Sequence, residues 1–282
     1  MPKPKPAKES RPRVIDTHMH INFQRLQSKE LAGKIGIRYT PAGLLKDMEE
    51  SNVVRALLMT VPGMPGVTKK FAEKYPGKFW VAGSVDPKSM TDETLAALEA
   101  DMAEGAIRAV KLYVGYQHYY PDDEDCVPLY RLLMKYDMPV IFHTGDCVST
   151  MARLKFSHPL NIDELAFRFP DLKIVMAHMG NPWLRDAAEV IYKNENVHAD
   201  LSGLITGLEE RYKKEYRERL LDQLESAIYY CGADHLMFGT DYCLASHADS
   251  LEFFSKLRIK KSDMNNFLYK NALKLYGRGE KI

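Results

Sequence analysis

Short apolar runs alternate with amphipathic stretches along the whole chain. The runs are no more than eight residues long, are rich in valine, isoleucine, leucine and phenylalanine, and are closed by glycine, proline or aspartate. Such runs, bounded by turn residues, predict buried β-strands. The predicted strands cover residues 13–20, 53–60, 79–85, 107–114, 139–144, 173–179, 197–202 and 236–241.

The stretches between these runs have the apolar spacing of helices. Thr40 and Pro41 supply an N-cap and a proline at the first helical position, and Gly277 is placed to end the last helix. Helices are therefore predicted at residues 40–51, 91–105, 125–136, 161–168, 183–194, 208–229, 247–257 and 262–276.

The eightfold alternation of apolar strand and helix decides the fold class. Near-continuously apolar strands separated by helices are typical of a parallel sheet that is covered on both faces. Eight such units predict an α/β protein with a single (β/α)₈ TIM barrel over residues 13–282, closed by a C-terminal helix. An open doubly wound sheet is the alternative, but no glycine-rich phosphate loop follows the first strand.

Composition and charge narrow the class of protein. Residues 1–12 are basic and proline-rich without the apolar core of a secretory signal, which predicts a disordered tail. The formal net charge is +1, and no strongly charged block interrupts the folded region, so nucleic acid is not an expected partner. No apolar run reaches the length of a membrane span. The four cysteines form no C-x-x-C pair, which favours reduced thiols in a cytoplasm.

Polar residues occur late in the predicted strands. His18 and His20 share one side of the first strand, because strand residues two apart point the same way, and imidazoles are common metal ligands. In a TIM barrel the catalytic groups come from the C-terminal ends of the strands. Six titratable side chains are therefore predicted to meet at one mouth: His18, His20, Lys111, His143, His178 and Asp241.

Six segments, spread in order over almost the whole folded region, resemble motifs of the amidohydrolase superfamily. The closest resemblance is to its amidohydrolase-related branch, which includes aminocarboxymuconate-semialdehyde decarboxylase and γ-resorcylate decarboxylase-like enzymes. As a set these motifs are specific, although singly none is. They are Asp16-Thr-His-Met-His20, Val110-Lys-Leu112, Phe142-His-Thr-Gly145, Ala177-His-Met-Gly180, Phe238-Gly-Thr-Asp-Tyr242 and Asn271-Ala-Leu-Lys-Leu-Tyr276.

The resemblance implies one divalent metal, usually zinc, with manganese or iron as alternatives. His178 would lie just outside the metal ligands and hold or deprotonate a water. Lys111 is expected to be uncarboxylated and to orient an anion, and a second metal is expected only if Lys111 is carboxylated. A small-molecule substrate is implied, and a homodimer is left open. The implied ligands are His18, His20, His143 and Asp241.

Two reactions fit this set of residues. In hydrolysis, Asp241 and His178 would manage the proton of a water that attacks an ester, lactone or amide carbonyl. In the alternative, a non-oxidative decarboxylation of an aromatic or unsaturated acid, one of the same two residues would protonate the carbon left behind. A metal-binding barrel without catalysis is a third hypothesis, which loss of His178 or Asp241 would have favoured.

Residues just past the strand ends are candidates for contact with the substrate. Tyr113, Tyr116 and Trp183 could line a pocket that accepts an aromatic ring, and Arg153 and Arg185 could bind a carboxylate. The side chains in these loops do not fix a pocket, so the substrate itself is not predicted. The loops expected to set specificity are 21–39, 61–66, 115–124 and 146–160.

Overall fold

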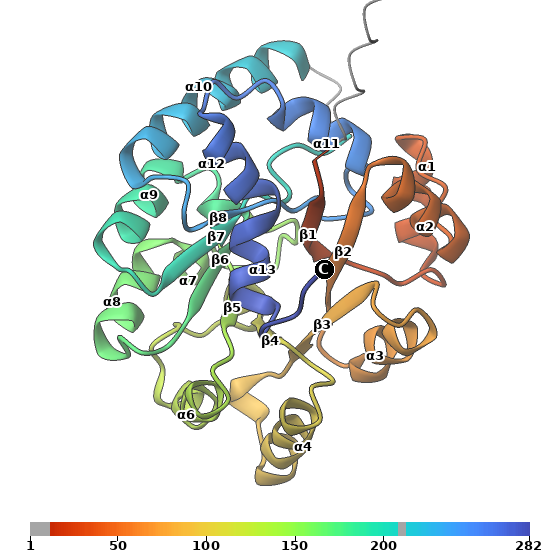
Figure 1. Cartoon of the computed structure of the whole chain (residues 1–282). Helices are drawn as coiled ribbons and strands as arrows, with labels where there is room; N and C mark the ends of the chain where they lie inside the picture. Colours follow the sequence, from red (N-terminus) through yellow and green to blue (C-terminus); the bar gives the residue numbers. More distant parts are fainter. Residues whose placement is uncertain (1–11, 208–212) are drawn as a thin grey trace, which may run out of the picture.

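The computed structural model describes residues 12–207 and 213–282 of the chain, and within them one parallel eight-stranded sheet (Figure 1). Its strands neighbour one another in sequence order, which confirms the predicted (β/α)₈ barrel. The strands are β1 (Val14–Met19), β2 (Val53–Met59), β3 (Phe79–Ser84), β4 (Ala109–Leu112), β5 (Val140–His143), β6 (Ile174–Ala177), β7 (Val197–Asp200) and β8 (Leu236–Met237).

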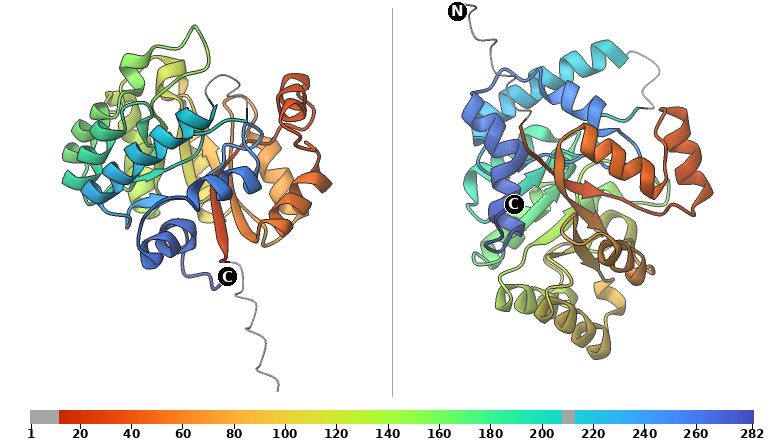
Figure 2. Two further views of the ribbon diagram at one scale, coloured as in Figure 1. Left: turned by 90° about the horizontal axis from the view of Figure 1, so that it is seen from above. Right: turned by 45° about the vertical axis from the view of Figure 1, so that its right-hand side comes forward.

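Helices surround the sheet on the outside (Figures 1 and 2). The longer ones are α1 (Leu26–Lys34), α2 (Pro41–Glu50), α3 (Pro65–Lys74), α4 (Asp92–Ala103), α6 (Val127–Lys135), α8 (Leu160–Arg168), α9 (Leu184–Lys193), α10 (Lys213–Cys231) and α11 (His247–Phe254). Short segments are η1 (Pro87–Ser89), α5 (Val114–Gln117), η2 (Glu124–Cys126), α7 (Leu154–Ser157), η3 (His178–Gly180), α12 (Lys261–Asn265), η4 (Asn266–Lys270) and α13 (Asn271–Tyr276). Within the described ranges, no helix is both long and apolar enough to cross a bilayer.

Two of the predicted helix starts have the expected caps. The side chain of Thr40 accepts a hydrogen bond from the N–H of Gly43 at the start of α2, and Thr91 accepts one from Thr94 at the start of α4. The predicted helix over 262–276 is instead divided into α12, the π-helical turn η4 and α13. Helices α1 and α3 were not predicted from the sequence.

Two sequence predictions fall partly outside the described residues. The tail predicted over residues 1–12 is described only at Pro12, and the helix predicted over 208–229 is described from residue 213 onward, where α10 begins.

The barrel is closed by backbone bonds beyond the end of β8. The sequence predicts an eighth strand over 236–241, but β8 ends at Met237 and Asp241 has a φ of 59°, which is not strand geometry. The N–H of Asp241 donates to the carbonyl of His18 at 2.9 Å, and the N–H of His20 donates to the carbonyl of Tyr242 at 2.9 Å. Closure therefore brings the segment around Asp241 directly beside the end of β1.

The core has two parts, one between the sheet and the helices and one inside the barrel. The inner part joins alternate strand residues such as Ile15, Leu57 and Ile141 to Tyr276 of α13. Helix α13 lies in front of the strands in Figure 1, and the side chain of Arg13, just before β1, contacts the carbonyl of Ile282. The C-terminus thus lies at the end of the barrel where the strands begin, opposite the mouth at which they end.

Candidate active site

β1 delivers the two histidines to the mouth through an irregularity in the strand. Asp16 pairs with Ala56 of β2 and Met19 with Leu58, so β1 contains one residue more than β2 between these pairs. Such a bulge changes the direction in which the following side chains point. His18 is fully buried and His20 is 30% exposed, and their rings are 5.3 Å apart. The structure therefore places the two imidazoles next to each other, as the H-x-H spacing predicts.

Asp241 joins this pair from the other side of the barrel closure. Ligand-type atoms of His18, His20 and Asp241 all lie within 4.8 Å of one another, and Nε2 of His20 is 3.6 Å from Oδ1 of Asp241. Gly203, in the loop after β7, has a φ of +63°, and a Cβ there would lie 3.3 Å from Oδ2 of Asp241 and 2.9 Å from Nδ1 of His178. A glycine at this position lets the backbone approach both side chains closely.

His143 and His178 form a second pair of rings at the same mouth. Nε2 of His143 is 2.8 Å from the carbonyl of Asp146, so this nitrogen must donate and Nδ1 is left with a lone pair. Nδ1 of His178 is 3.1 Å from the carbonyl of Ser202, so it donates too, and Nε2 carries the lone pair. The two lone-pair nitrogens face each other at 3.2 Å. Only a cation or a shared proton makes that contact favourable.

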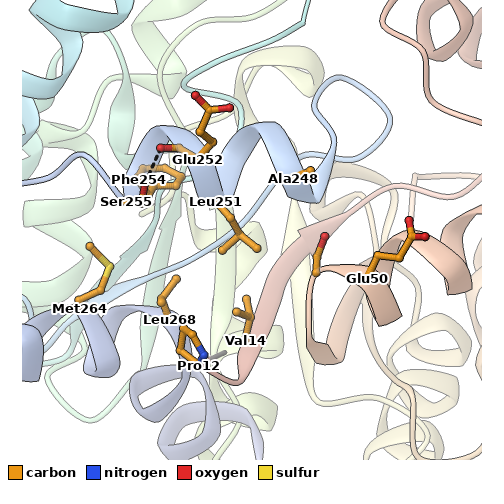
Figure 3. Close-up of a pocket in the computed structure, with 11 residues that line it drawn as sticks. Pro12, Val14, Glu50, Ala248, Leu251, Glu252, Phe254, Ser255, Met264 and Leu268 are labelled. Carbon is orange, nitrogen blue, oxygen red and sulfur yellow. Dashed lines mark hydrogen bonds between the residues drawn. The ribbon is translucent and has the colours of Figure 1, made fainter. Parts of the chain in front are cut away.

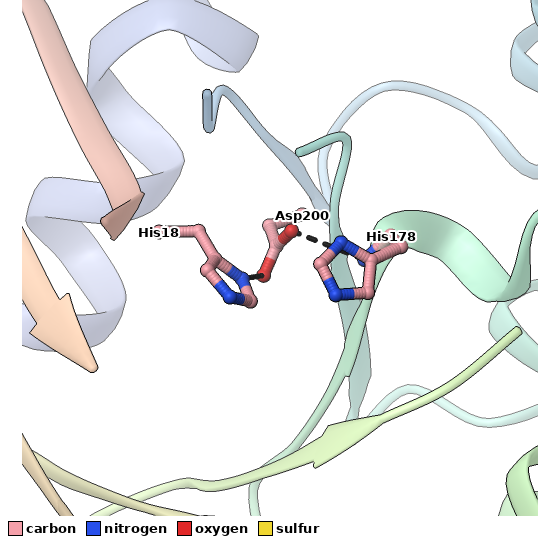
Figure 4. A group of neighbouring side chains, drawn as sticks. All are labelled: His18, His178 and Asp200. Atoms are coloured by element: carbon pink, nitrogen blue, oxygen red, sulfur yellow. Dashed lines mark hydrogen bonds and ion pairs between the residues drawn. The ribbon is translucent and has the colours of Figure 1, made fainter. Parts of the chain in front are cut away.

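Asp200, at the end of β7, lies between His18 and His178 (Figure 4). Its Oδ2 is 3.0 Å from Nδ1 of His18. Its Oδ1 accepts hydrogen bonds from the backbone N–H of His178 and from the hydroxyl of Ser202. A carboxylate on one imidazole nitrogen fixes the tautomer and leaves the other nitrogen free to bind a metal. Nε2 of His18 is buried and has no hydrogen-bond partner within the described part of the chain. The sequence analysis missed Asp200, although it ends a strand like the other site residues.

Lys111 of β4 is fully buried beneath these groups. Among the described residues, no acceptor lies within hydrogen-bond reach of its Nζ, which is 5.6 Å from the centre of the Tyr113 ring. Burial lowers the pKa of Lys111 to about 8, against the attraction of the carboxylates of Asp200 and Asp241. A buried cation without a close partner is unfavourable unless an anion is bound near it.

Burial also governs the ionisation of the other site residues. It lowers the pKa of His20 to about 4 and that of His143 to about 3, and the positive charge of Lys111 acts in the same direction. It raises the pKa of Asp241 to about 7, which Lys111 partly offsets. The imidazoles are therefore neutral at neutral pH, the state in which they bind metals, and Asp241 can exchange a proton there.

These features fit a divalent cation. The donor set is imidazole nitrogen and carboxylate oxygen, which suits zinc. The partnerless Nε2 of His18 and the facing lone pairs of His143 and His178 are both satisfied by a positive ion. His143 is not in the group formed by His18, His20 and Asp241, so its role as a fourth ligand stays a prediction.

The mouth opens into a cavity of about 590 Å³. His20, His143, His178 and Asp241 line it, together with Tyr113 and Tyr116 from the segment after β4, and Arg25 and Tyr39 from the segments around α1. Tyr113 and Tyr116 thus line the cavity, and their contact with a substrate stays a prediction. Arg25 was not predicted, and the loop between β1 and α2 gave no pattern to single it out.

A second cavity of about 500 Å³ lies on the outside of the barrel, between α2, α11 and the segment around Leu268 (Figure 3). Its walls are mainly apolar, and its titratable residues are Glu50 and Glu252. The first residue of β1, Val14, borders it, so it lies toward the end of the barrel opposite the mouth. The chemistry of the side chains therefore favours the mouth as the active site.

Three predicted substrate contacts are not brought to the cavity. The ring of Trp183 packs against that of His158 at 4.7 Å, and Arg153 precedes α7 with its N–H bonded to the carbonyl of Gly115. Arg185 borders a separate surface depression between α9 and α10. These three residues do not line the mouth cavity, so their contact with the substrate stays a prediction that the cavity wall does not support.

The contact between Asp200 and His18 leads to a test. Replacing Asp200 by asparagine is expected to reduce the affinity for zinc about 10- to 100-fold, because the carboxylate no longer orients the imidazole or makes it more basic. The measurement is a zinc titration in competition with a chromophoric chelator. Asp163→Asn, which removes an exposed ion pair with Lys193, is the matched control. Unchanged zinc affinity of Asp200→Asn would contradict this role.

The fold and the site together define a (β/α)₈-barrel enzyme with a histidine and carboxylate cluster where the strands end. The sequence matches the family described as Amidohydrolase over residues 67–278. Since this match spans most of the chain, the protein belongs to the amidohydrolase family. The comparison with curated proteins found no significant match.

Solved structures with the same fold cover nearly the whole chain. An amidohydrolase from Burkholderia multivorans with bound zinc has a TM-score of 0.73 at 16% identity, covering 94% of this chain and 99% of the other. The 5-carboxyvanillate decarboxylase LigW from Sphingomonas paucimobilis gives 0.69 at 17%, with the same coverage. A probable 2-pyrone-4,6-dicarboxylic acid hydrolase from Acinetobacter baumannii gives 0.66 at 16%, again covering 94% and 99%. At these identities the likenesses establish the fold.

Proposed function

We propose that this amidohydrolase is a metal-dependent hydrolase: water attacks the carbonyl carbon of an ester, a lactone or an amide, and the single bond from that carbon to the leaving oxygen or nitrogen breaks. The observation that carries the proposal is the group formed by His18, His20 and Asp241 at the wall of the mouth cavity. Buried imidazole lone pairs and a carboxylate at the wall of a cavity are the groups that metal-assisted hydrolysis requires.

The metal we propose is a single zinc ion held by His18, His20 and Asp241, with His143 as the fourth ligand. When bound, such an ion lowers the pKa of a water and polarises the carbonyl of the substrate. Zinc is favoured over manganese and iron by the excess of imidazole nitrogen in this set, and the Burkholderia multivorans amidohydrolase of the same fold binds zinc. Lys111 is proposed to stay uncarboxylated, so that no second metal is needed.

The proton of the attacking water has two acceptors in this arrangement. Nε2 of His178 is unprotonated, because Nδ1 of the same ring donates to Ser202, and it opens into the cavity wall beside His143. The carboxyl of Asp241, whose Oδ1 is 3.6 Å from Nε2 of His20, is the second group that can take the proton and return it to the leaving group. A general base of this kind contributes about 10²- to 10⁴-fold to the rate.

The cavity wall indicates what the substrate looks like. Tyr113 and Tyr116 offer aromatic faces next to His143, with ring centres 6.5 and 4.9 Å from it. Arg25 lines the cavity, so an anionic group on the substrate would meet a cation there. Lys111 is buried and does not line the cavity, so its charge would act on such a group through the wall. We propose a small, flat and negatively charged molecule.

Metal-dependent decarboxylation is the second candidate. The same cationic and aromatic wall would bind a hydroxylated aromatic acid, and one decarboxylase, that of 5-carboxyvanillate, shares the fold. In this case Asp241 or His178 would deliver a proton to the ring carbon that loses CO₂, instead of accepting one from water.

One experiment separates the two candidates. The purified protein is analysed for metal, loaded with zinc, and incubated with panels of lactones, aryl esters and hydroxybenzoates. Hydrolysis of a lactone or ester without release of CO₂ supports the proposal, and one metal per chain supports the single-ion site. Release of CO₂ without ester hydrolysis would replace the proposal by decarboxylation. Two metals per chain would indicate a carboxylated Lys111.

Arg25 gives a further prediction. Arg25→Met is expected to raise KM about tenfold for a substrate that carries a carboxylate, because a charge-assisted hydrogen bond at the cavity rim is lost. A neutral ester of the same shape should be affected little. Steady-state kinetics with the two substrates test this, with Arg153→Met as the control, since Arg153 does not line the cavity. An equal change in KM for both substrates would show that Arg25 does not bind the carboxylate.

A further inference from the structure

A charged network outside the barrel connects to the segments that carry the candidate metal ligands. His247, the first residue of α11, is fully buried, and each of its ring nitrogens faces a carboxylate. Nδ1 is 2.9 Å from Oδ2 of Asp47 on α2, and Nε2 is 3.1 Å from Oδ2 of Asp16 on β1. No motif in the sequence pointed to His247, and none of the steps proposed above uses it.

Asp16 links this network to the mouth. Its carboxylate is completely buried and accepts the N–H of His18 at 2.9 Å. It also accepts both donors of Thr240, the backbone N–H at 3.2 Å and the hydroxyl at 2.6 Å. One carboxylate therefore holds the start of the H-x-H pair and the residue before Asp241 at the same time.

The position of Asp241 depends on these contacts. Asp241 has a left-handed backbone, which is unfavourable for a residue with a Cβ and must be stabilised by its surroundings. Its N–H is bonded to His18, and the hydroxyl of Thr240 accepts the N–H of Tyr242. The turn that presents Asp241 to the two histidines is thus tied down on both sides, and Asp16 supplies the side-chain part of that restraint.

The positive charge of His247 stabilises the buried, negatively charged carboxylate of Asp16. Two carboxylates and one imidazolium meet in a region that water does not reach at Asp16 or at His247. Burial disfavours the charged imidazole, but the negative carboxylates of Asp16 and Asp47 beside its two ring nitrogens outweigh burial and raise the pKa of His247 to about 9. Without His247, the buried carboxylate of Asp16 would keep its hydrogen bonds to His18 and Thr240 but lose this ion pair, which is unfavourable for a buried charge.

We propose that His247 is a positioning residue for the active site: by bridging Asp47 and Asp16, it holds the Thr240–Asp241 turn against the strand that carries His18 and His20. The consequence for the metal rests on the proposed function, whereas the effect on the turn does not. His247 touches neither the substrate nor the metal ligands through its ring nitrogens, and it acts through Asp16.

The test compares His247→Gln with Asp249→Asn. Glutamine keeps hydrogen-bonding groups and removes the charge. Asp249 is on α11 like His247, and Asp249→Asn breaks an ion pair with Arg217 of α10 that does not involve Asp16. Backbone hydrogen exchange of the metal-free protein is measured by NMR. We expect exchange at the N–H groups of Thr240 and Asp241 to be at least about tenfold faster in His247→Gln, with Ile141 in β5 unchanged.

The affinity for zinc is measured on the same proteins. His247→Gln is expected to bind zinc about 10- to 100-fold more weakly, the range found when groups that orient metal ligands are removed, and Asp249→Asn is expected to bind as the wild type does. Asp47→Asn, at a side chain that is 23% exposed, should shift both measurements in the same direction by a smaller factor. If His247→Gln does not fold, the same two measurements on Asp47→Asn test the positioning role.

The outcomes separate this inference from the proposed function. If the wild-type protein binds no zinc, the proposed function fails, while faster exchange at Thr240 and Asp241 still supports the role of His247. If exchange at these two residues is unchanged in His247→Gln, or rises equally at Ile141, the positioning role is overturned. If exchange rises locally and zinc affinity does not change, the turn is held by His247 but its position does not matter for the metal, which overturns the link to the site.

Discussion

Asp241→Asn is expected to abolish turnover of the substrate that the panels identify, with a loss of at least about 10³-fold in kcat. The asparagine keeps the shape of the side chain but can neither accept a proton nor supply the negative oxygen that lies within 4.8 Å of the imidazole nitrogens. Proton transfer alone accounts for about 10²- to 10⁴-fold, and weaker metal binding would add to the loss. Steady-state kinetics with a saturating concentration of zinc measure the part that does not come from lost metal.

Asp234→Asn is the control for this experiment. Asp234 is an exposed carboxylate that is hydrogen-bonded to Asn266. It lies just before β8 begins, and therefore at the end of the barrel opposite the mouth. It should retain wild-type kcat. Activity of Asp241→Asn within tenfold of the wild type would remove Asp241 from the proton-transfer role and leave His178 as the base.

The order of the fold was predictable because each part of it is local. A strand buried on both faces must be apolar along its length, as 139–144 and 173–179 are, and a helix needs an apolar stripe, so each unit could be found on its own. Helix α3 was missed because it begins with Pro65 and Gly66, which look like a turn. The end of β8 was misplaced because the left-handed backbone of Asp241 depends on bonds to β1.

The site residues that could be predicted are those at the C-terminal ends of the strands, where the catalytic groups of a TIM barrel lie. This rule identified the histidines and Asp241, and applied to β7 it would also have found Asp200. The course of a loop in space follows from no such rule, which is why Arg153 and Arg185 were expected at the cavity that Arg25 lines instead. Contacts such as that of Asp16 with His247, 231 positions apart in the sequence, depend on the packing of α2, α11 and β1 and leave no local pattern.

Removing the metal with a chelator at pH 7 is expected to abolish turnover and to lower the thermal midpoint of unfolding by about 10 °C. An ion bound only by the folded chain stabilises it by about 4 kcal/mol when its concentration is 1,000 times Kd. In a chain of 282 residues, each kcal/mol shifts the midpoint by about 2–4 °C. Without the ion, the lone pairs of His143 and His178 face each other and Nε2 of His18 has no hydrogen-bond partner among the described residues, so these costs of burial are not compensated.

Scanning calorimetry of the wild type and of His20→Gln, each with zinc and with chelator, tests this expectation. The variant lacks one of the proposed ligands, so its midpoint should depend much less on zinc than that of the wild type. Because both proteins keep the same core and the same number of other histidines, a nonspecific effect of zinc would shift them equally. An equal shift, or no shift in the wild type, would mean that the cluster at the mouth does not bind the ion, and the hydrolytic mechanism would lose its basis.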